Sequence, residues 1–295
     1  MTKRAFVVGI DDYDNWNSAG PLAFPRLKYC AADATAFAML LTTSFGFGPD
    51  DVILCENAEA TLQSILGGLT NLLSPSQPGD VICFYFAGMG GRVPENGWGV
   101  RSARYYDAIV PSDGAGMLMD YQLVALAQSL LPPGVNLTIV MDTCHSGASA
   151  SDAVVRFRGF GWSADLIGAF ISNCRTVIPF AGWPDPSVLD GNISNPLRAD
   201  QRVTMTTDAT KDSSAQARAL LLSACNYGEM AAESNNQSHG YLTNALLELA
   251  NQPDFQMNPA ALLQGLRQKV SGYSAGQQTP QLRGRPVGTQ DVFLG

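Results

Sequence analysis

Short apolar runs alternate along this chain with longer segments in which apolar residues recur at helical spacing. Continuous apolar runs predict strands that are buried on both faces of a sheet, and they lie at 5–10, 51–55, 80–88, 135–142 and 217–226. Helical segments are predicted at 30–47, 58–73, 120–131, 240–252 and 258–270. This alternation is typical of an α/β protein in which helices cover a parallel sheet.

The alternation breaks between 146 and 215, where Gly, Ser, Asp, Asn and Pro are frequent. Long segments of this kind within a compact domain are usually functional or disordered, and we expect partial order here. Strand and helix patterns resume after this excursion. Because the two halves are expected to share one sheet, we predict a single domain over 1–295.

Composition narrows the classes of function. Of the 295 residues, 46% are hydrophobic and 15% charged, enough for a large core, and the net charge is −8. An acidic chain without a Lys/Arg cluster argues against nucleic-acid binding. No apolar run is long enough for a membrane span, and the first one is too short for a signal peptide. The six cysteines are scattered without CxxC pairs, so we expect no disulfide framework, no zinc site and a cytoplasmic location.

Two strand ends carry the residues with the most chemical interest. The run at 80–88 leads into the turn "GMGG" with Met89 and Gly90, and the run at 135–142 leads into "DTCHSG" with Cys144. In open α/β sheets, ligands bind beyond the carboxyl ends of the strands. The spacing between Met89 and Cys144 is close to the roughly 50 residues that separate histidine and cysteine in caspases.

Seven motifs in order resemble the caspase superfamily, and most closely the metacaspases and the prokaryotic orthocaspases. They are "AFVVGIDDY", "LKYCAADA", "GDVICFYFAGMGGR", "DAIVPSD", "DTCHSG", "LLLSACNYGEMAAES" and "HGYLTNALLE". The resemblance implies a caspase-like fold, with a mostly parallel central sheet of about six strands and helices on both faces. It also divides the domain into a p20-like part (1–145), an intersubunit-type excursion (146–215) and a p10-like part (216–295).

The resemblance also implies roles for site residues. Cys144 corresponds to the nucleophile of a cysteine peptidase, and its amide together with that of Gly90 to the oxyanion hole. Asp33 and Asp142 correspond to an acidic S1 pocket that selects Arg or Lys at P1 of a peptide substrate. Ala87 stands where the family has a pocket serine. Taken alone, Asp33 also fits a solvated helix surface, and Asp142 fits a turn cap.

Met89 stands where the resemblance places the catalytic histidine. A free thiol is mostly protonated at neutral pH, and methionine neither accepts nor donates a proton. Loss of a general acid/base lowers rates by about 10²–10⁴, so we expect weak or absent peptide hydrolysis. His145 adjoins Cys144, but neighbouring side chains after a strand tend to point apart. For His239 a structural or surface role is expected.

Three functions therefore remain open: an endopeptidase that cuts after Arg or Lys, a pseudopeptidase that binds basic peptides or a partner protein, and a fold with an idle cleft. Many metacaspases are activated by calcium. The segment after the first turn keeps Asp107 and Asp113 but lacks a dense acidic run. The sequence does not favour calcium activation, and we expect no metal or other cofactor. As in metacaspases, a monomer is expected.

Overall fold

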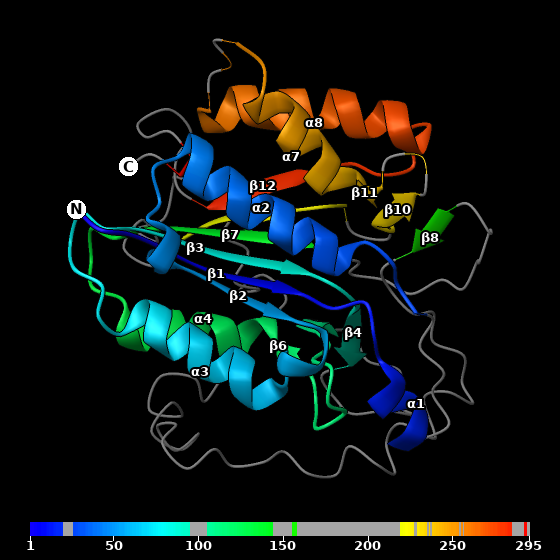
Figure 1. The fold of residues 1–295 in the computed structure, drawn as a ribbon, viewed down its shortest axis with the longest axis horizontal. Helices are drawn as coiled ribbons and strands as arrows, with labels where there is room; N and C mark the ends of the chain where they lie inside the picture. Colours follow the sequence, from blue (N-terminus) through cyan, green and yellow to red (C-terminus); the bar gives the residue numbers. More distant parts are fainter. Residues whose placement is uncertain are drawn as a thin grey trace.

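A six-stranded sheet forms the centre of the computed structural model, in the order β12-β9-β7-β3-β1-β2 (Figure 1). Five strands run parallel and β12 is antiparallel to its neighbour, which confirms the predicted mostly parallel sheet. The strands are β1 (Lys3–Gly9), β2 (Val52–Glu56), β3 (Val81–Ala87), β7 (Asn136–Asp142), β9 (Ala219–Ser223) and β12 (Gln281–Gly284). The structure describes residues 1–19, 26–94, 105–143, 155–157, 219–226, 229–234, 236, 238–253, 255, 257–284 and 292–293.

Helices cover both faces of this sheet (Figure 1). Helices α2, α7 and α8 lie on one face, and α3 and α4 lie on the other. Each helix coincides with a segment that the sequence pattern predicted, with ends that differ by a few residues. The bounds are α2 (Cys30–Ser44), α3 (Leu62–Leu73), α4 (Asp120–Leu130), α7 (Tyr241–Ala250) and α8 (Pro259–Ser274).

Shorter elements were not predicted from the sequence. Two additional three-stranded sheets are present, in the orders β4-β5-β6 and β11-β10-β8, together with one short helix and two 3₁₀ turns. They are β4 (Gly90–Pro94), β5 (Tyr105–Ile109), β6 (Leu118–Met119), β8 (Val155–Phe157), β10 (Ala232–Ser234), β11 (His239–Gly240), α1 (Asp14–Ala19), η1 (Pro49–Asp51) and η2 (Asn57–Glu59). The strands among them have two to five residues, too few for a recognisable alternation.

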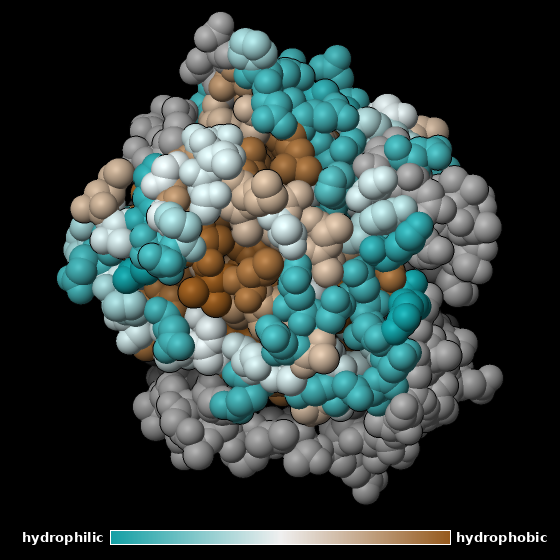
Figure 2. All heavy atoms as spheres, in the orientation of Figure 1, coloured by the Kyte–Doolittle hydropathy of each residue, from teal (hydrophilic) through white to brown (hydrophobic). Residues whose placement is uncertain are grey.

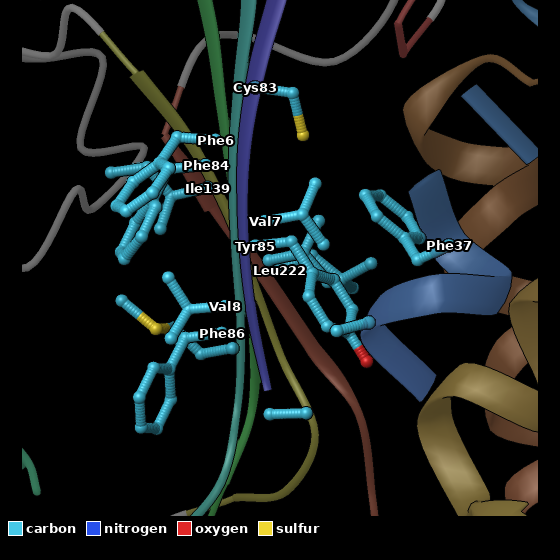
Figure 3. Close-up of a cluster of buried hydrophobic side chains, with 14 of the residues drawn as sticks. Phe6, Val7, Val8, Phe37, Cys83, Phe84, Tyr85, Phe86, Ile139 and Leu222 are labelled. Carbon is cyan, nitrogen blue, oxygen red and sulfur yellow. The ribbon is translucent and has the colours of Figure 1, made fainter. Parts of the chain in front are cut away.

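Aromatic side chains from the central strands pack on both faces of the sheet (Figure 3). Phe6 and Phe84 stack on one face, with ring centroids 5.9 Å apart. On the other face, Tyr85 stacks on Phe37 of α2 at 4.3 Å. All seven residues of β3 are buried, as its continuous apolar run predicts.

Helix α2 lies very close to the end of β1, because Gly9 has no side chain. A Cβ atom there would lie 2.4 Å from the carbonyl oxygen of Cys30 and 2.7 Å from the Cβ of Ala34. These are backbone and short side-chain atoms that cannot rotate away, so a larger residue must displace the helix.

We expect Gly9→Ala to lower the free energy of unfolding by about 1–3 kcal/mol, the usual effect of overpacking. Gly272→Ala on α8 is the matched control, since no atom lies within 4 Å of its added Cβ, and removal of a helical glycine stabilises by about 0.4–1 kcal/mol. Urea denaturation of both variants measures the difference. Equal midpoints would show that α2 can shift freely.

Candidate active site

The carboxyl ends of the central strands bring the two predicted turns together. Gly9 of β1 pairs with Ala87 of β3, which in turn pairs with Asp142 of β7. The predicted pocket positions Ala87 and Asp142 are therefore neighbours on adjacent strands. Cys144 follows two residues later and, with His145, lies outside the described residues. Its role as nucleophile stays a prediction.

The carboxylate of Asp142 is buried and bonded to the first turn of α7. Its Oδ2 accepts hydrogen bonds from the amide of Thr243 at 3.2 Å and from the Thr243 hydroxyl at 2.6 Å. Since that hydroxyl donates to a carboxylate, it accepts from the hydroxyl of Tyr85, 2.6 Å away. Tyr85 and Asp142 are both inaccessible to solvent. A buried polar chain thus joins β3, β7 and α7.

Asp33 lies in the first turn of α2 and is also inaccessible to solvent. Its Oδ1 is 2.6 Å from Nδ1 of His239, and its Oδ2 accepts the amide of Gly240 at 3.0 Å. The alternative that Asp33 belongs to a solvated surface is therefore wrong. The reason is tertiary: the start of α2 packs against β11 and the start of α7.

One short segment, residues 239–243, binds both acidic side chains. Gly240, the residue before α7, has no side chain to cap the helix, so its amide and that of Thr243 are bonded by carboxylates from other elements. Negative groups are favourable at a helix N-terminus, where amides lack intrahelical partners. The sequence pattern did not reveal the roles of Thr243 and Tyr85, and for His239 it indicated no specific partner. The only signal was the position of "HGYLT" at the start of a helix.

Met89 packs entirely inside the hydrophobic core. Its amide donates to the hydroxyl of Tyr13 at 2.7 Å, and its carbonyl accepts the amide of Val110 at 3.0 Å. Both backbone groups are thus engaged, and the thioether cannot take part in proton transfer. The side chain of Met89 therefore fills space in the core, as methionine commonly does.

The residues on either side of Met89 shape the turn. A Cβ atom at Gly88 would lie 2.6 Å from the hydroxyl oxygen of Tyr13 and 2.9 Å from Cζ of Phe86, so the close approach of these rings requires glycine. Gly90 begins β4 and pairs with Ile109 of β5. The oxyanion role of the Gly90 amide stays a prediction, because the partner amide of Cys144 lies outside the described residues.

Four cysteines in the described part of the chain are buried and outside any disulfide: Cys30, Cys55, Cys83 and Cys225. Burial raises the pKa of Cys55 to about 11, with a further contribution from the charges of Glu59 and Glu56. Burial also raises the pKa of Cys83 well above its usual range. Nucleophilic cysteines have lowered pKa values, so Cys55 and Cys83 are structural.

Acidic groups also surround the start of α2. The ligating atoms of Asp11, Cys30 and Glu233 lie within 4.8 Å of one another, a spacing that could hold a metal ion. However, Asp11 accepts the amide of Cys30 at 2.7 Å, and Glu233 accepts the amide of Lys28 at 2.8 Å. Asp11 thus binds the first amide of α2, where negative groups are favourable, and Glu233 binds an amide just before the helix.

The two acids considered for calcium lie near β5. Asp107 is part of β5 itself. Asp113 accepts the amide of Leu62 at the start of α3 and that of Ala115, both at 3.3 Å. Asp113 therefore has structural partners, and the absence of calcium activation stays a prediction.

An open cavity of about 550 Å³ lies beyond the end of β1. Arg26 at its wall pairs with Asp12 and Asp14. The amide of Asp14 and the guanidinium of Arg26 hold the pKa of Asp12 below its usual value. The lining residues are Asp11, Asp12, Asp14, Asn15, Arg26, Leu27, Lys28, Asn57, Ala58 and Ser112. Tyr13, which lies between Asp12 and Asp14 in the sequence, accepts the amide of Met89.

Comparison with known proteins identifies the family. A sequence model of the caspase domain matches residues 2–288. Metacaspase-1 of Schizosaccharomyces pombe is 26% identical over 95% of this chain and 66% of its own length. Metacaspase-7 of Arabidopsis thaliana is 30% identical over 52% of this chain and 37% of its own length. The chain thus spans from about a third to two thirds of these relatives.

The structural comparison agrees. A crystal structure of protein GSU0716 from Geobacter sulfurreducens superposes with a TM-score of 0.65 and covers 97% of this chain and 95% of its own, at 18% identity. That likeness establishes the shared fold. Together with the sequence model, which spans nearly the whole chain, and the metacaspase relatives, it shows that this chain belongs to the caspase-domain family of peptidases.

Proposed function

We propose that the chain is a metacaspase-like cysteine endopeptidase scaffold with an acidic S1 pocket for Arg or Lys at P1, and that Met89 leaves cleavage weak or lost. In this proposal Cys144 is the nucleophile, and the Gly90 amide contributes to the oxyanion hole. Asp33 and Asp142 select the basic side chain beside Ala87. The substrates are then proteins or peptides with accessible Arg or Lys.

The observation that carries the proposal is the joint burial of Asp33 and Asp142 around the start of α7. Carboxylates are seldom buried without a specific role or partner. A carboxylate has about four lone-pair sites and can accept two parallel bonds from a guanidinium group, so two carboxylates suit a pocket for Arg or Lys. Charge-assisted bonds of this kind are the strong ones in recognition.

A second candidate function is a pseudopeptidase that binds basic peptides or a partner protein without turnover. Two features favour it. Met89 is completely buried and its thioether cannot accept a proton, and the acidic residues Asp33 and Asp142 are retained. We further propose a monomer in the cytoplasm that binds no nucleic acid and no membrane and needs no cofactor. In the described part of the chain, no helix has the length and apolar character needed to cross a bilayer.

A binding measurement tests the pocket independently of catalysis. We expect Asp33→Asn to weaken binding of a fluorescent peptide with P1 arginine by about 10- to 100-fold, because a hydrogen bond to a charged group contributes about 1.5–3 kcal/mol. Fluorescence anisotropy measures the affinity. Asn keeps the size of the side chain and removes the charge.

Glu248→Gln is the matched control, since it removes one negative charge from an exposed ion pair with Lys269, and such pairs contribute little. The same peptide with norleucine at P1 should bind wild type and Asp33→Asn equally. Equal arginine affinity in Asp33→Asn and Glu248→Gln would contradict an acidic S1 pocket.

A further inference from the structure

Strand β2 forms one edge of the central sheet (Figure 1). It pairs in parallel with β1, and the sheet order ends there among the described residues. The five residues Val52–Glu56 contain no proline and no lysine. Edge strands expose unpaired amides and carbonyls, and proteins normally protect them with such residues, with bulges or with covering elements.

Exposed apolar side chains gather at this same edge. Ile53 is 56% exposed and Leu54 is 37% exposed, while Met39 on the adjacent α2 is 61% exposed. The only other large apolar side chain that is exposed in the described part of the chain is Met1, at the terminus. Figure 2 shows a hydrophobic area between α2 and α3, where β2 lies in Figure 1. We name Met39, Ile53 and Leu54 the β2 edge patch.

Contacts around β2 place Met39 and Leu54 on the same face. Thr35 of α2 donates to Glu56 at 2.7 Å. Met39 lies one helical turn after Thr35, and Leu54 lies two residues before Glu56, so both point to the side that those two residues share. Ile53 points to the opposite face, so the patch exposes apolar surface on both sides of a backbone edge that no other described strand pairs with.

The β2 edge patch is flanked by acidic residues at both ends. Asp50 and Asp51 precede β2, and Glu56 and Glu59 end or follow it. Strand β1 begins with two bases, and both have partners away from β2. The guanidinium of Arg4 lies 3.6 Å from the carboxylate of Asp80, and the ammonium of Lys3 donates to the carbonyl of Phe45 at 2.6 Å. A ligand that lies along this edge therefore meets negative charge at both ends.

This charge pattern distinguishes between two occupants. A second copy of the chain, related by a twofold axis, would pair β2 with β2 in antiparallel fashion. Asp50 and Asp51 would then lie beside Glu56 and Glu59 of the other copy, and like charges directly opposite are destabilising. An extended segment with basic flanks would instead find complementary charge.

We propose that the free edge of β2 binds an extended peptide segment of a partner protein, with alternating apolar residues flanked by Lys or Arg. Main-chain hydrogen bonds to β2 supply affinity, as in other cases of strand addition. Ile53, Leu54 and Met39 contact the apolar side chains. The acidic flanks select the basic ends. This site is separate from the acidic pocket and does not depend on peptidase activity.

The test uses a labelled nine-residue probe with five alternating Val and Thr residues between two lysines at each end. We expect Ile53→Lys to weaken its binding at least tenfold, because the substitution adds repulsive charge at the edge. Gln268→Lys is the matched control, since it adds the same charge at an exposed position of α8. Methylation of alternate backbone nitrogens of the probe should weaken binding similarly, and a probe with glutamate flanks should not bind.

Each alternative outcome overturns the proposal. Equal affinities of Ile53→Lys and Gln268→Lys would exclude the β2 edge, and undiminished binding of the methylated probe would exclude strand pairing. A dimer in sedimentation analysis that Ile53→Lys abolishes would assign the edge to a second copy. Because the lysines of the probe could also enter the acidic pocket, the comparison of Ile53→Lys with Gln268→Lys is repeated in the Asp33→Asn background. A difference that persists there belongs to the β2 edge, so failure of the acidic pocket and failure of this site can be told apart.

Discussion

Met89→His is expected to raise hydrolysis of a fluorogenic peptide with P1 arginine by about 10²–10⁴, the usual contribution of a general acid/base. The physical reason is that imidazole at position 89 can accept the thiol proton of Cys144 and return it to the leaving amine, whereas a thioether can do neither. The measurement is kcat/KM at neutral pH for wild type and variant.

Two controls isolate the proton-transfer step. Met89→Gln has similar size and polarity to histidine but no basic nitrogen, so it should stay as inactive as wild type. Cys144→Ala in the Met89→His background sets the blank. Because Met89 is completely buried, thermal unfolding of each variant must show a folded protein. Wild-type cleavage as fast as that of Met89→His, or equal rates for Met89→Gln and Met89→His, would refute the assignment of position 89.

Thr243→Val is expected to lower the free energy of unfolding by about 2–5 kcal/mol. Valine preserves the shape but removes the hydroxyl that donates to Asp142 and accepts from Tyr85, both at 2.6 Å. Each of these buried groups then loses a hydrogen bond, which costs about 1–3 kcal/mol and more for a charged group. Chemical denaturation measures the change.

Thr70→Val is the matched control, because the Thr70 hydroxyl bonds only within its own helix, to the carbonyl of Leu66 at 2.8 Å. A double-mutant cycle with Tyr85→Phe should show coupling, since both changes break the same bond. The loss should be accompanied by weaker binding of the P1 arginine peptide. If Thr243→Val costs no more than Thr70→Val, the buried chain does not hold Asp142.

The main strands and helices were predictable because their signals are local. The apolar run at 80–88 corresponds to the fully buried β3. The helical segment at 30–47 corresponds to α2, which ends at Ser44. Gly46, two residues later, has a φ of 68°. Such runs reflect burial on both faces, and a glycine near a helix end supplies the left-handed conformation.

Strand β12 shows where local signals fail. Its residues, Gln281–Gly284, lie in a polar segment rich in Gln, Gly and Pro that gave no strand pattern. It is an edge strand that pairs antiparallel with β9 and is only half buried where its side chains are described. Backbone pairing with β9 defines this strand, and Leu282 is its one apolar side chain packed against the core. A single apolar residue gives no alternation from which a strand could be predicted.

The sequence by itself determined the buried strands, the covering helices, the order of the motifs and the absence of a basic residue at position 89. Only the tertiary structure decided that Asp33 bonds to a histidine 206 positions away and Asp142 to a threonine 101 positions away. Hydrophobic periodicity indicates which residues face the interior, and it can be recognised within each segment by itself. A hydrogen bond between distant residues depends on how whole elements pack, and no single segment contains that information.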